Sequence, residues 1–260
     1  MTMVTPLYEG TFSVGKDENF IPIGRDDEPE KGALKIAINP FLIKTPDRVY
    51  LIDAGLGPFG HDTSCSTIRD NLEEHDLTEY DVTDIFLSHL HYDHMGGLAE
   101  QCDGFWELTF PDATLWTSKP DWEKNMSLDT FYDDKKTEFL HFLDAKADLA
   151  YYEEVDGSPY PDIQTRRIDG HTEYHRAIYF ERGPHKYLMA GDVIGAVSSV
   201  NRKYAAKYDH NPEQSMKMRK ELAREAYEQE YTIMGYHDPH HPLARLTDYS
   251  KRKGYTIESA

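Results

Sequence analysis

The sequence predicts a mixed α/β (α+β) fold in a single domain that spans residues 1–260. Hydrophobic residues make up 39% of the chain, which is enough for a sizeable packed core, and the length fits one large domain better than two small ones. Short apolar segments typical of strands alternate with longer segments typical of helices. Several of the apolar segments end in aspartate or histidine. Ligands of mixed α/β folds bind at the carboxyl ends of strands, so one rim of the sheets is expected to carry the site.

The first 32 residues are expected to be irregular, because polar clusters such as Gly24–Gly32 interrupt them. A strand region at 33–45 follows, and Pro40 breaks it because proline removes a donor from the ladder. The further expected strands are 48–55, 84–89, 113–118, 163–169, 176–181, 186–192 and 231–236. The expected helices are 66–75, 134–149 and 211–230. The last helix has the clearest start, with Asn211 as N-cap and Pro212 at the first helical position.

The chain is strongly acidic, with a formal net charge of −19. Phosphate contacts need a basic surface, so the charge argues against a nucleic-acid partner. It argues equally against docking on an anionic membrane. Two interpretations of the charge stay open: general solubility, or a surface adapted to a host with high internal salt.

Targeting signals are not recognised in the sequence. No stretch approaches the ~18 apolar residues that span a bilayer. The opening segment MTMVTPLYEGTF lacks the basic start and apolar centre of a signal peptide. The two cysteines, Cys65 and Cys102, are too few for a disulfide framework. These features predict a cytoplasmic protein.

The strongest local signal is the segment 88–97, SHLHYDHMGG. Residues two apart in an extended segment point the same way, so His89 and His91 can bind one metal ion. The chain then turns, which lets Asp93 and His94 face a second position nearby. The two glycines that follow permit a close approach of the backbone.

Two ligand pairs cannot complete two metal sites, because a catalytic zinc usually has three protein ligands and paired metals share a bridging group. Other strand ends supply further candidates. His171 lies in DGHT, Asp192 in AGD and His237 in GYHDP. The assignment of His237 is the weakest of these, because His240 and His241 follow closely.

This set of residues resembles the metallo-β-lactamase superfamily. The matching features are Asp53 in LIDAGLG, the His89-x-His91-x-Asp93-His94 motif with its Gly-Gly, His171, Asp192 and His237. They occur in the family's order and cover nearly the whole chain. The resemblance implies a four-layer αββα sandwich in which two mixed sheets face each other and a dinuclear metal site lies at one edge.

The resemblance also implies roles for individual residues. His89, His91 and His171 would bind the first metal, and Asp93, His94 and His237 the second, with Asp192 bridging both. Asp53 would accept a hydrogen bond near the ligands and orient them, and His175 would support the ligands without binding metal. The sequence departs from the family where Asp169 stands in place of the usual proline and Glu173-Tyr174 in place of Pro-Gly.

Within the superfamily, the chain looks like the lactonases and the related phosphotriester hydrolases. The charge disfavours the nuclease branches, and the flavin-containing branch needs a further domain. The resemblance implies a hydrolase of small neutral esters, lactones or phosphotriesters, in which a hydroxide bridging two divalent metals is the nucleophile. Asp93 and Asp192 are the expected catalytic residues, and Asp93 is a candidate proton donor to the leaving group. The best-known lactonases carry a tyrosine where this chain has Gly195, which weakens the case for homoserine-lactone activity.

Several points stay open at this stage. Zinc is the default metal, while manganese, iron and cobalt suit the same ligand types. The expected partner is a small-molecule substrate, and a homodimer is left open. The alternative function is a mono-iron persulfide-dioxygenase-like or glyoxalase-II-like thioesterase enzyme of the same fold. Aromatic side chains expected at the rim of a pocket are Phe59, Phe105, Trp106, Trp116, Trp122, Phe131 and Tyr132. Tyrosines that could replace the missing donor are Tyr92, Tyr174 and Tyr236.

Overall fold

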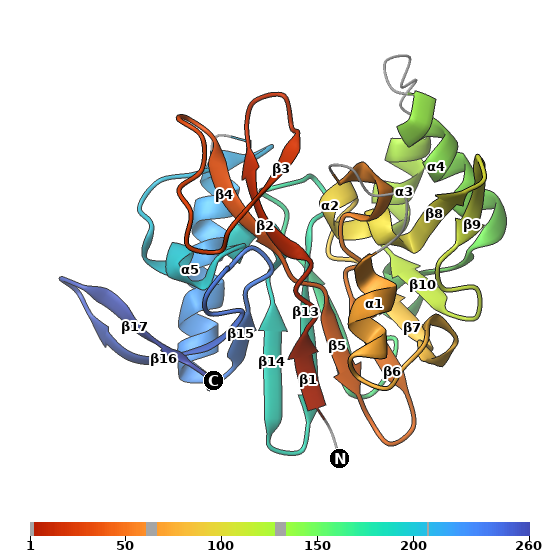
Figure 1. Ribbon diagram of the computed structural model, residues 1–260. Coiled ribbons are helices and arrows are strands. Elements are labelled where there is room, and N and C mark those ends of the chain that lie inside the picture. The colour runs from red at the N-terminus through yellow and green to blue at the C-terminus, as the bar shows by residue number, and fades with distance from the viewer. Residues whose placement is uncertain (1–2, 61–66, 128–133, 207) are drawn as a thin grey trace. The chain divides into compact units, whose positions relative to one another are not determined.

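The computed structural model describes residues 3–60, 67–127, 134–206 and 208–260. Its contacts divide the chain into two compact units, Met1–Glu153 and Glu154–Ala260. Each unit contains a six-stranded sheet together with helices, so the predicted mixed α/β fold class is confirmed. Figure 1 shows these helices and strands along the chain. The interpretation of residues 1–260 as one domain stays a prediction.

The sheet of the first unit has the strand order β1-β5-β6-β7-β10-β11. These strands are β1 (Met3–Pro6), β5 (Phe41–Lys44), β6 (Val49–Ile52), β7 (Asp84–Phe86), β10 (Thr114–Thr117) and β11 (Asp148–Tyr151). β6, β7, β10 and β11 run parallel to one another, whereas β5 is antiparallel to β6. β6 and β7 are almost entirely buried and mostly apolar, as expected for central parallel strands. Ile52 pairs with Phe86, so β6 and β7 end at the same edge of the sheet.

Helices and smaller sheets complete the first unit. Helices α1 (Thr67–Glu73), α3 (Lys119–Ser127) and α4 (Asp134–Lys146) contribute apolar side chains to its core. A three-stranded sheet has the order β3-β2-β4, formed by β2 (Gly10–Val14), β3 (Phe20–Ile23) and β4 (Leu34–Ile38). The short hairpin consists of β8 (Ala99–Cys102) and β9 (Phe105–Leu108). Trp122, Phe139 and Leu143 are fully buried, or nearly so, in this core.

The sheet of the second unit has the order β12-β13-β14-β15-β16-β17. Its strands are β12 (Ile163–Arg167), β13 (Arg176–Arg182), β14 (His185–Met189), β15 (Thr232–Met234), β16 (Leu243–Ser250) and β17 (Gly254–Ser259). β13 is antiparallel to both β12 and β14, and β14 is parallel to β15. The carboxyl ends of β12, β14 and β15 therefore meet at one edge.

Helix α5 (Pro212–Glu228) packs against this sheet. Met218, Leu222 and Ala226 are spaced four residues apart and form its buried stripe. The predicted start is confirmed, since Pro212 is the first helical residue and the Asn211 side chain accepts a hydrogen bond from the backbone N–H of Gln214 at 3.1 Å.

Some expectations about the elements were wrong. The first 32 residues contain β1, β2 and β3. β1 and β3 are partly exposed, and β2 is mostly buried but short and includes Thr11 and Ser13, so none has the long apolar run of a central strand. The helix expected at 134–149 ends at Lys146, because Asp148–Tyr151 pairs with β10 as strand β11. Cys65 and Ser66 lie outside the described residues.

Within the described ranges, the structure has no helix that combines the length and the apolar character needed to cross a membrane.

Candidate functional site

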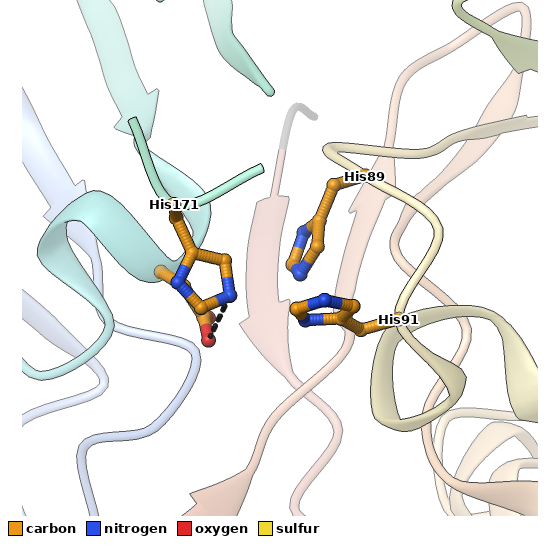
Figure 2. Close-up of side chains that lie close together, drawn as sticks. His89, His91 and His171 are labelled. Carbon is orange, nitrogen blue, oxygen red and sulfur yellow. Dashed lines mark ion pairs between the residues drawn. The ribbon is translucent and has the colours of Figure 1, made fainter. Parts of the chain in front are cut away.

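The predicted metal motif of the first unit follows β7 directly. His91 is still extended, with φ −77° and ψ 147°, and the short helix α2 (Tyr92–Met95) begins at the next residue. The rings of His89 and His91 lie with their centroids 4.5 Å apart, and Figure 2 shows them side by side. The ring of His94 lies 4.1 Å from that of His89, and the side chain of Asp93 lies 3.8 Å from the Nε2 atom of His94. The motif therefore brings its four candidate ligands together in this unit.

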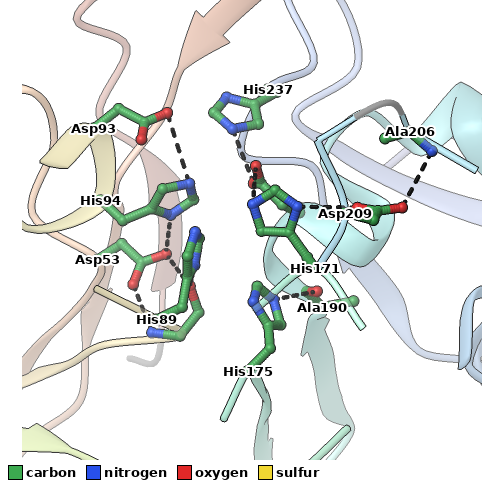
Figure 3. Close-up of polar contacts among 12 residues, drawn as sticks. Asp53, His89, Asp93, His94, His171, His175, Ala190, Ala206, Asp209 and His237 are labelled. Atoms are coloured by element: carbon green, nitrogen blue, oxygen red, sulfur yellow. Dashed lines mark hydrogen bonds and ion pairs between the residues drawn. The ribbon is translucent and has the colours of Figure 1, made fainter. Parts of the chain in front are cut away.

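Asp53 forms hydrogen bonds with residues of this motif. It follows β6 and adopts a φ of 57°, a left-handed conformation that aspartate tolerates better than most residues. Its carboxylate accepts hydrogen bonds from the backbone N–H of Ser88 at 2.7 Å and from the Ser88 hydroxyl at 2.8 Å. The Nδ1 atom of His94 lies 2.7 Å from the same carboxylate, as Figure 3 shows. The predicted Asp53 thus lies next to the ligand cluster, with no exposure to solvent.

These contacts determine which nitrogen of each imidazole faces a ligand. The Ser88 hydroxyl donates to Asp53 and so accepts from the Nδ1 of His89, 3.0 Å away. The Nδ1 of His94 donates to Asp53 directly. In both rings, Nδ1 carries the proton, and Nε2 carries the lone pair that a metal ion requires. Sequence analysis missed Ser88, although it stands beside His89 in the motif.

Glycines allow this motif to pack against the loop after β6. A Cβ atom at Gly96 would collide with the carbonyl oxygen of Leu56, and one at Gly97 would collide with that of Ala54. The close backbone approach expected of the two glycines is confirmed. The same loop rests on Glu9, whose carboxylate accepts a hydrogen bond from the Leu56 N–H at 3.0 Å. Burial raises the pKa of Glu9 to about 8, although the hydrogen bond from Leu56 opposes this shift.

The second unit brings the other three predicted ligands together. His171, Asp192 and His237 follow β12, β14 and β15, which end at the same edge of the sheet. One oxygen of Asp192 lies 3.2 Å from the Nε2 of His171, and the other lies 2.9 Å from the Nε2 of His237. The pair with His171 is the dashed line in Figure 2. Each carboxylate oxygen thus faces a different imidazole, an arrangement that suits a bridging ligand.

His175 and Gly195 shape this cluster without belonging to it. The fully buried His175 donates from Nε2 to the carbonyl oxygen of Ala190 at 3.2 Å, two residues before Asp192. Its supporting role stays a prediction.

The carbonyl oxygen of Gly195 accepts a hydrogen bond from the His237 backbone N–H at 2.8 Å. A Cβ atom at Gly195 would lie 2.9 Å from the Cδ2 of His237, so the histidine ring occupies the space of a side chain at this position.

Asp209 is the main residue that sequence analysis missed. Its carboxylate lies 3.0 Å from the Nδ1 of His171, whereas Asp192 lies near the Nε2 of the same ring. Figure 3 shows Asp209 beside His171. The two residues are 38 positions apart, and Asp209 belongs to no motif. The sequence feature nearest to Asp209 that could have drawn attention to it is the predicted start of a helix at Asn211.

The predicted aromatic rim is only partly supported by the structure. Trp122 is a core residue whose indole N–H donates to Asp144 at 2.9 Å, and Trp116 stacks on Phe86 and Tyr152. Both positions therefore pack within the fold and were wrongly expected at a rim. Phe131 and Tyr132 lie outside the described residues.

The remaining aromatics form a group around α2. Phe59 contacts Tyr92 and Trp106, with centroids 4.5 and 6.4 Å away, and Phe105 on the adjoining hairpin is exposed.

Among the candidate tyrosines, the Tyr92 hydroxyl donates to the carbonyl oxygen of Lys136 at 3.5 Å. The other two candidate tyrosines differ in burial: Tyr236 is fully buried, and Tyr174 is half-buried beneath the guanidinium of Arg167.

The donor atoms fit divalent metal ions. Imidazole nitrogens and carboxylate oxygens are the ligands that zinc and related metals accept in catalytic sites. Three of the histidines have Nδ1 bound to a carboxylate or hydroxyl, and this is the orientation typical of metal-binding histidines. Within each unit, the candidate ligands lie close to one another and are of types that can bind a metal ion.

Comparisons with known proteins agree with this chemistry. The family model of the metallo-beta-lactamase superfamily matches residues 35–235. A probable metal-dependent hydrolase from Staphylococcus aureus has a similar structure, with a TM-score of 0.78 and 21% identity over 100% of this chain and 98% of the other. AidC, a dizinc quorum-quenching lactonase, in complex with a product, gives a TM-score of 0.77 at 20% identity, over 100% and 94% of the chains. The hydrolase AbOPH in the beta lactamase superfamily gives 0.74 at 20% identity, with the same coverage. No curated protein sequence matches the chain.

Proposed function

The chain belongs to the metallo-beta-lactamase superfamily and is a metal-dependent hydrolase of that family, and we propose that it hydrolyses small neutral esters, lactones or phosphotriesters with two divalent metal ions. The observation that carries this proposal is the arrangement of Asp192, whose two oxygens face His171 and His237 separately. A carboxylate in this position suits a shared ligand of two ions. The solved lactonase AidC, which has a similar fold, is described as a dizinc enzyme.

The proposed ligand sets follow the order of the motifs. His89, His91 and His171 would hold the first ion, and Asp93, His94 and His237 the second, with Asp192 shared, as membership of the family implies. The buried Asp53 keeps Nε2 of His94 directed at its ion. Zinc is the expected metal, and manganese, iron or cobalt suit the same donors.

When bound, the two ions supply Lewis acidity and lower the pKa of a coordinated water. The residues of the chain supply orientation and proton transfer. Asp192 would hold both ions, because its two oxygens face different imidazoles. Asp93, whose side chain is 13% exposed, would accept the proton released by the attacking water and pass it to the oxygen of the leaving group.

The proposed substrates are neutral and partly apolar. A net charge of −19 disfavours polyanions near the surface, including nucleic acid and anionic membranes. Phe59, Tyr92 and Trp106 form an aromatic group at α2. We take this group as support for a substrate that carries an apolar acyl or aryl moiety. Gly195 in place of a tyrosine makes homoserine lactones the weakest members of the substrate set.

The test begins with the metal content of the purified protein. The apo protein is reconstituted with excess zinc or manganese, and metal is measured by elemental analysis after removal of unbound ions. Two ions per chain are expected, and at most one would contradict the proposal. His91→Ala is expected to lower the count, whereas the exposed helical His141→Ala is the matched control that leaves it unchanged.

A panel of lactones, aryl esters and phosphotriesters then tests the reaction. Turnover that depends on reconstitution with metal supports the proposal. A protein that holds one iron and consumes oxygen with a persulfide, without hydrolysing any member of the panel, would overturn it.

A further inference from the structure

Asp209 is a buried carboxylate that the ligand assignment does not use. Its side chain is fully shielded from solvent, and burial of an unpaired charge is strongly destabilising. Both oxygens have partners: Oδ1 faces the Nδ1 of His171 at 3.0 Å, and Oδ2 accepts from the Ala206 backbone N–H at 3.1 Å. Figure 3 shows the carboxylate between these two groups. The site around Asp209 is therefore built to hold a carboxylate beside one particular imidazole.

The imidazole of His171 lies between two carboxylates. Asp209 is at its Nδ1, and Asp192 is 3.2 Å from its Nε2. A proton on Nδ1 satisfies Asp209 and leaves the lone pair of Nε2 directed to the side where Asp192 lies. The same relationship occurs in the first unit, where Asp53 accepts from the Nδ1 of His94. Each unit thus pairs one buried carboxylate with the Nδ1 of one predicted ligand.

Backbone contacts fix Asp209 relative to the segment that carries His171. The N–H of His210 donates to the carbonyl of His171 at 2.9 Å, and the N–H of Asn211 donates to that of Gly170 at 2.7 Å. Gly170 has a φ of +103°, and a Cβ atom there would lie 2.7 Å from the backbone of Ser215. The start of α5 and the His171 segment therefore pack too closely to move independently.

Arg219 connects the same helix to Asp192. This residue of α5 is 3% exposed and donates to the carbonyl of Val193, the neighbour of Asp192, at 2.9 Å. It also donates to the carbonyl of Tyr204 at 2.9 Å, in the loop that leads to Asp209. Burial lowers the pKa of Arg219, and the Asp209 carboxylate opposes that shift, so the two charges stabilise each other.

We propose that Asp209 is a positioning residue that fixes the tautomer and orientation of His171, so that its Nε2 binds metal. The inference rests on the proposed function, because it assumes that His171 is a ligand. Loss of a carboxylate behind a metal-binding histidine typically weakens metal affinity by ~10–100-fold. Asp209→Asn is the sharpest variant, since its amide is nearly isosteric. An amide nitrogen turned to Nδ1 would favour a proton on Nε2, the tautomer that cannot bind metal there.

The experiment measures zinc affinity by competition with a chelator, together with the visible spectrum of the cobalt-substituted protein. Asp209→Asn is expected to bind zinc about 10–100-fold more weakly and to change the cobalt spectrum. Asp248→Asn, an exposed aspartate of β16 in the same unit, is the control. Affinity and spectrum that match the wild type would overturn the proposal. A wild type that binds no zinc would instead overturn the proposed function, before any variant is compared.

Two further measurements separate positioning from general stabilisation. In a double-mutant cycle, Asp209→Asn should have no further effect on zinc affinity once His171→Ala is present, whereas additive effects would contradict action through His171. Nitrogen-15 NMR of the zinc-loaded wild type, labelled at histidine, needs no variant to fold. It should show His171 protonated at Nδ1, and a proton on Nε2 would overturn the proposal.

Discussion

The Nδ1 atom of His94 lies 2.7 Å from Oδ2 of Asp53, and both side chains are completely buried. Asp53 also accepts both hydrogen bonds offered by Ser88, so a single carboxylate orients the backbone and the side chains at the start of the motif. The strand register explains why these residues meet. β6 and β7 are parallel neighbours, and the residues just beyond their ends share one edge of the sheet.

Asp53→Asn should therefore weaken metal binding without removing the ligands. The amide can accept from only one oxygen, so either Ser88 or His94 loses its acceptor. We expect zinc affinity to fall by about 10–100-fold, as is usual when the partner behind a ligand is lost. Chelator competition measures the change. The exposed Asp112→Asn serves as control, and equal affinities for the two variants would contradict the role of Asp53.

Asp192→Ala should reduce activity more than His237→Ala. Asp192 faces two imidazoles, so its loss removes a ligand from both proposed ions, whereas His237 serves one. A water molecule can replace a terminal ligand more readily than a shared one. Hydrolysis rates and metal content of the two variants provide the comparison. Equal metal retention together with higher activity in the Asp192 variant would show that Asp192 is not the bridge.

Gly195→Ala should disturb His237 for purely steric reasons. The backbone at Gly195 has φ −59° and ψ −49°, which alanine adopts without strain, but its Cβ would lie 2.9 Å from the His237 ring. The ring must shift, so we expect weaker binding of one metal ion. Gly195→Tyr should disturb His237 at least as much, and so should not create a homoserine lactonase.

A double-mutant cycle with His237→Ala checks the steric explanation. In that background, Gly195→Ala should have no further effect on metal content. A Gly195→Ala protein with normal metal affinity would show that the ring can move at no cost.

The sequence was informative wherever buried strands end in ligands. The strands before Asp53, His89 and His237 are short, buried and mostly apolar, and such segments are recognisable because parallel strands are buried on both faces. The strand before Asp192 is buried only at its end, at Leu188 and Met189. The β16–β17 hairpin was missed because its residues are mostly exposed and polar, which leaves no apolar segment to detect. Where the edges and hairpins of a sheet face solvent, the sequence pattern weakens.

The residues that support the candidate ligands were harder to predict from the sequence than the ligands themselves. Asp53 was predicted because it lies in a recognisable motif, whereas Asp209 reaches His171 only through the packing of α5. Helix α4 illustrates the same limit at an element boundary. Leu149 fits the apolar face of a helix, but pairing with Leu115 places it in β11. Contacts between segments far apart in the sequence decide such cases.

Glu9 should make stability depend on pH. Burial raises its pKa from 4.5 to about 8, so the folded state holds the proton more tightly than the unfolded state. The contribution of protonated Glu9 to the stability of the folded state is fully present below pH 4.5, and it is lost as the pH rises to about 8. Over that range the free energy of unfolding should fall by up to about 1.4 kcal/mol per pH unit from this group.

Glu9→Gln removes the titration while keeping an acceptor for the Leu56 N–H. Urea unfolding at pH 5, 6, 7 and 8 should show the variant gaining stability relative to the wild type as the pH rises. The exposed Glu107→Gln should follow the wild type throughout. Parallel curves for Glu9→Gln and the wild type would show that Glu9 does not titrate in this range.

The charge of the chain predicts how matched neutral and anionic substrates differ. A phosphotriester and the corresponding phosphodiester offer the same phosphorus centre, but the diester carries a negative charge. The net charge of −19 should raise the KM of the diester relative to the triester, while the chemistry of the site sets kcat for both. Added salt screens the repulsion between charges more than ~8 Å apart, so the ratio of the two KM values should fall from low to high ionic strength. Measuring KM and kcat for both substrates with the metal-loaded protein over a salt series tests this directly.

RNA and DNA, which repeat the anionic diester along their length, should not be hydrolysed. Robust nuclease activity without turnover of esters, lactones or phosphotriesters would contradict both the substrate class and the role of the acidic surface.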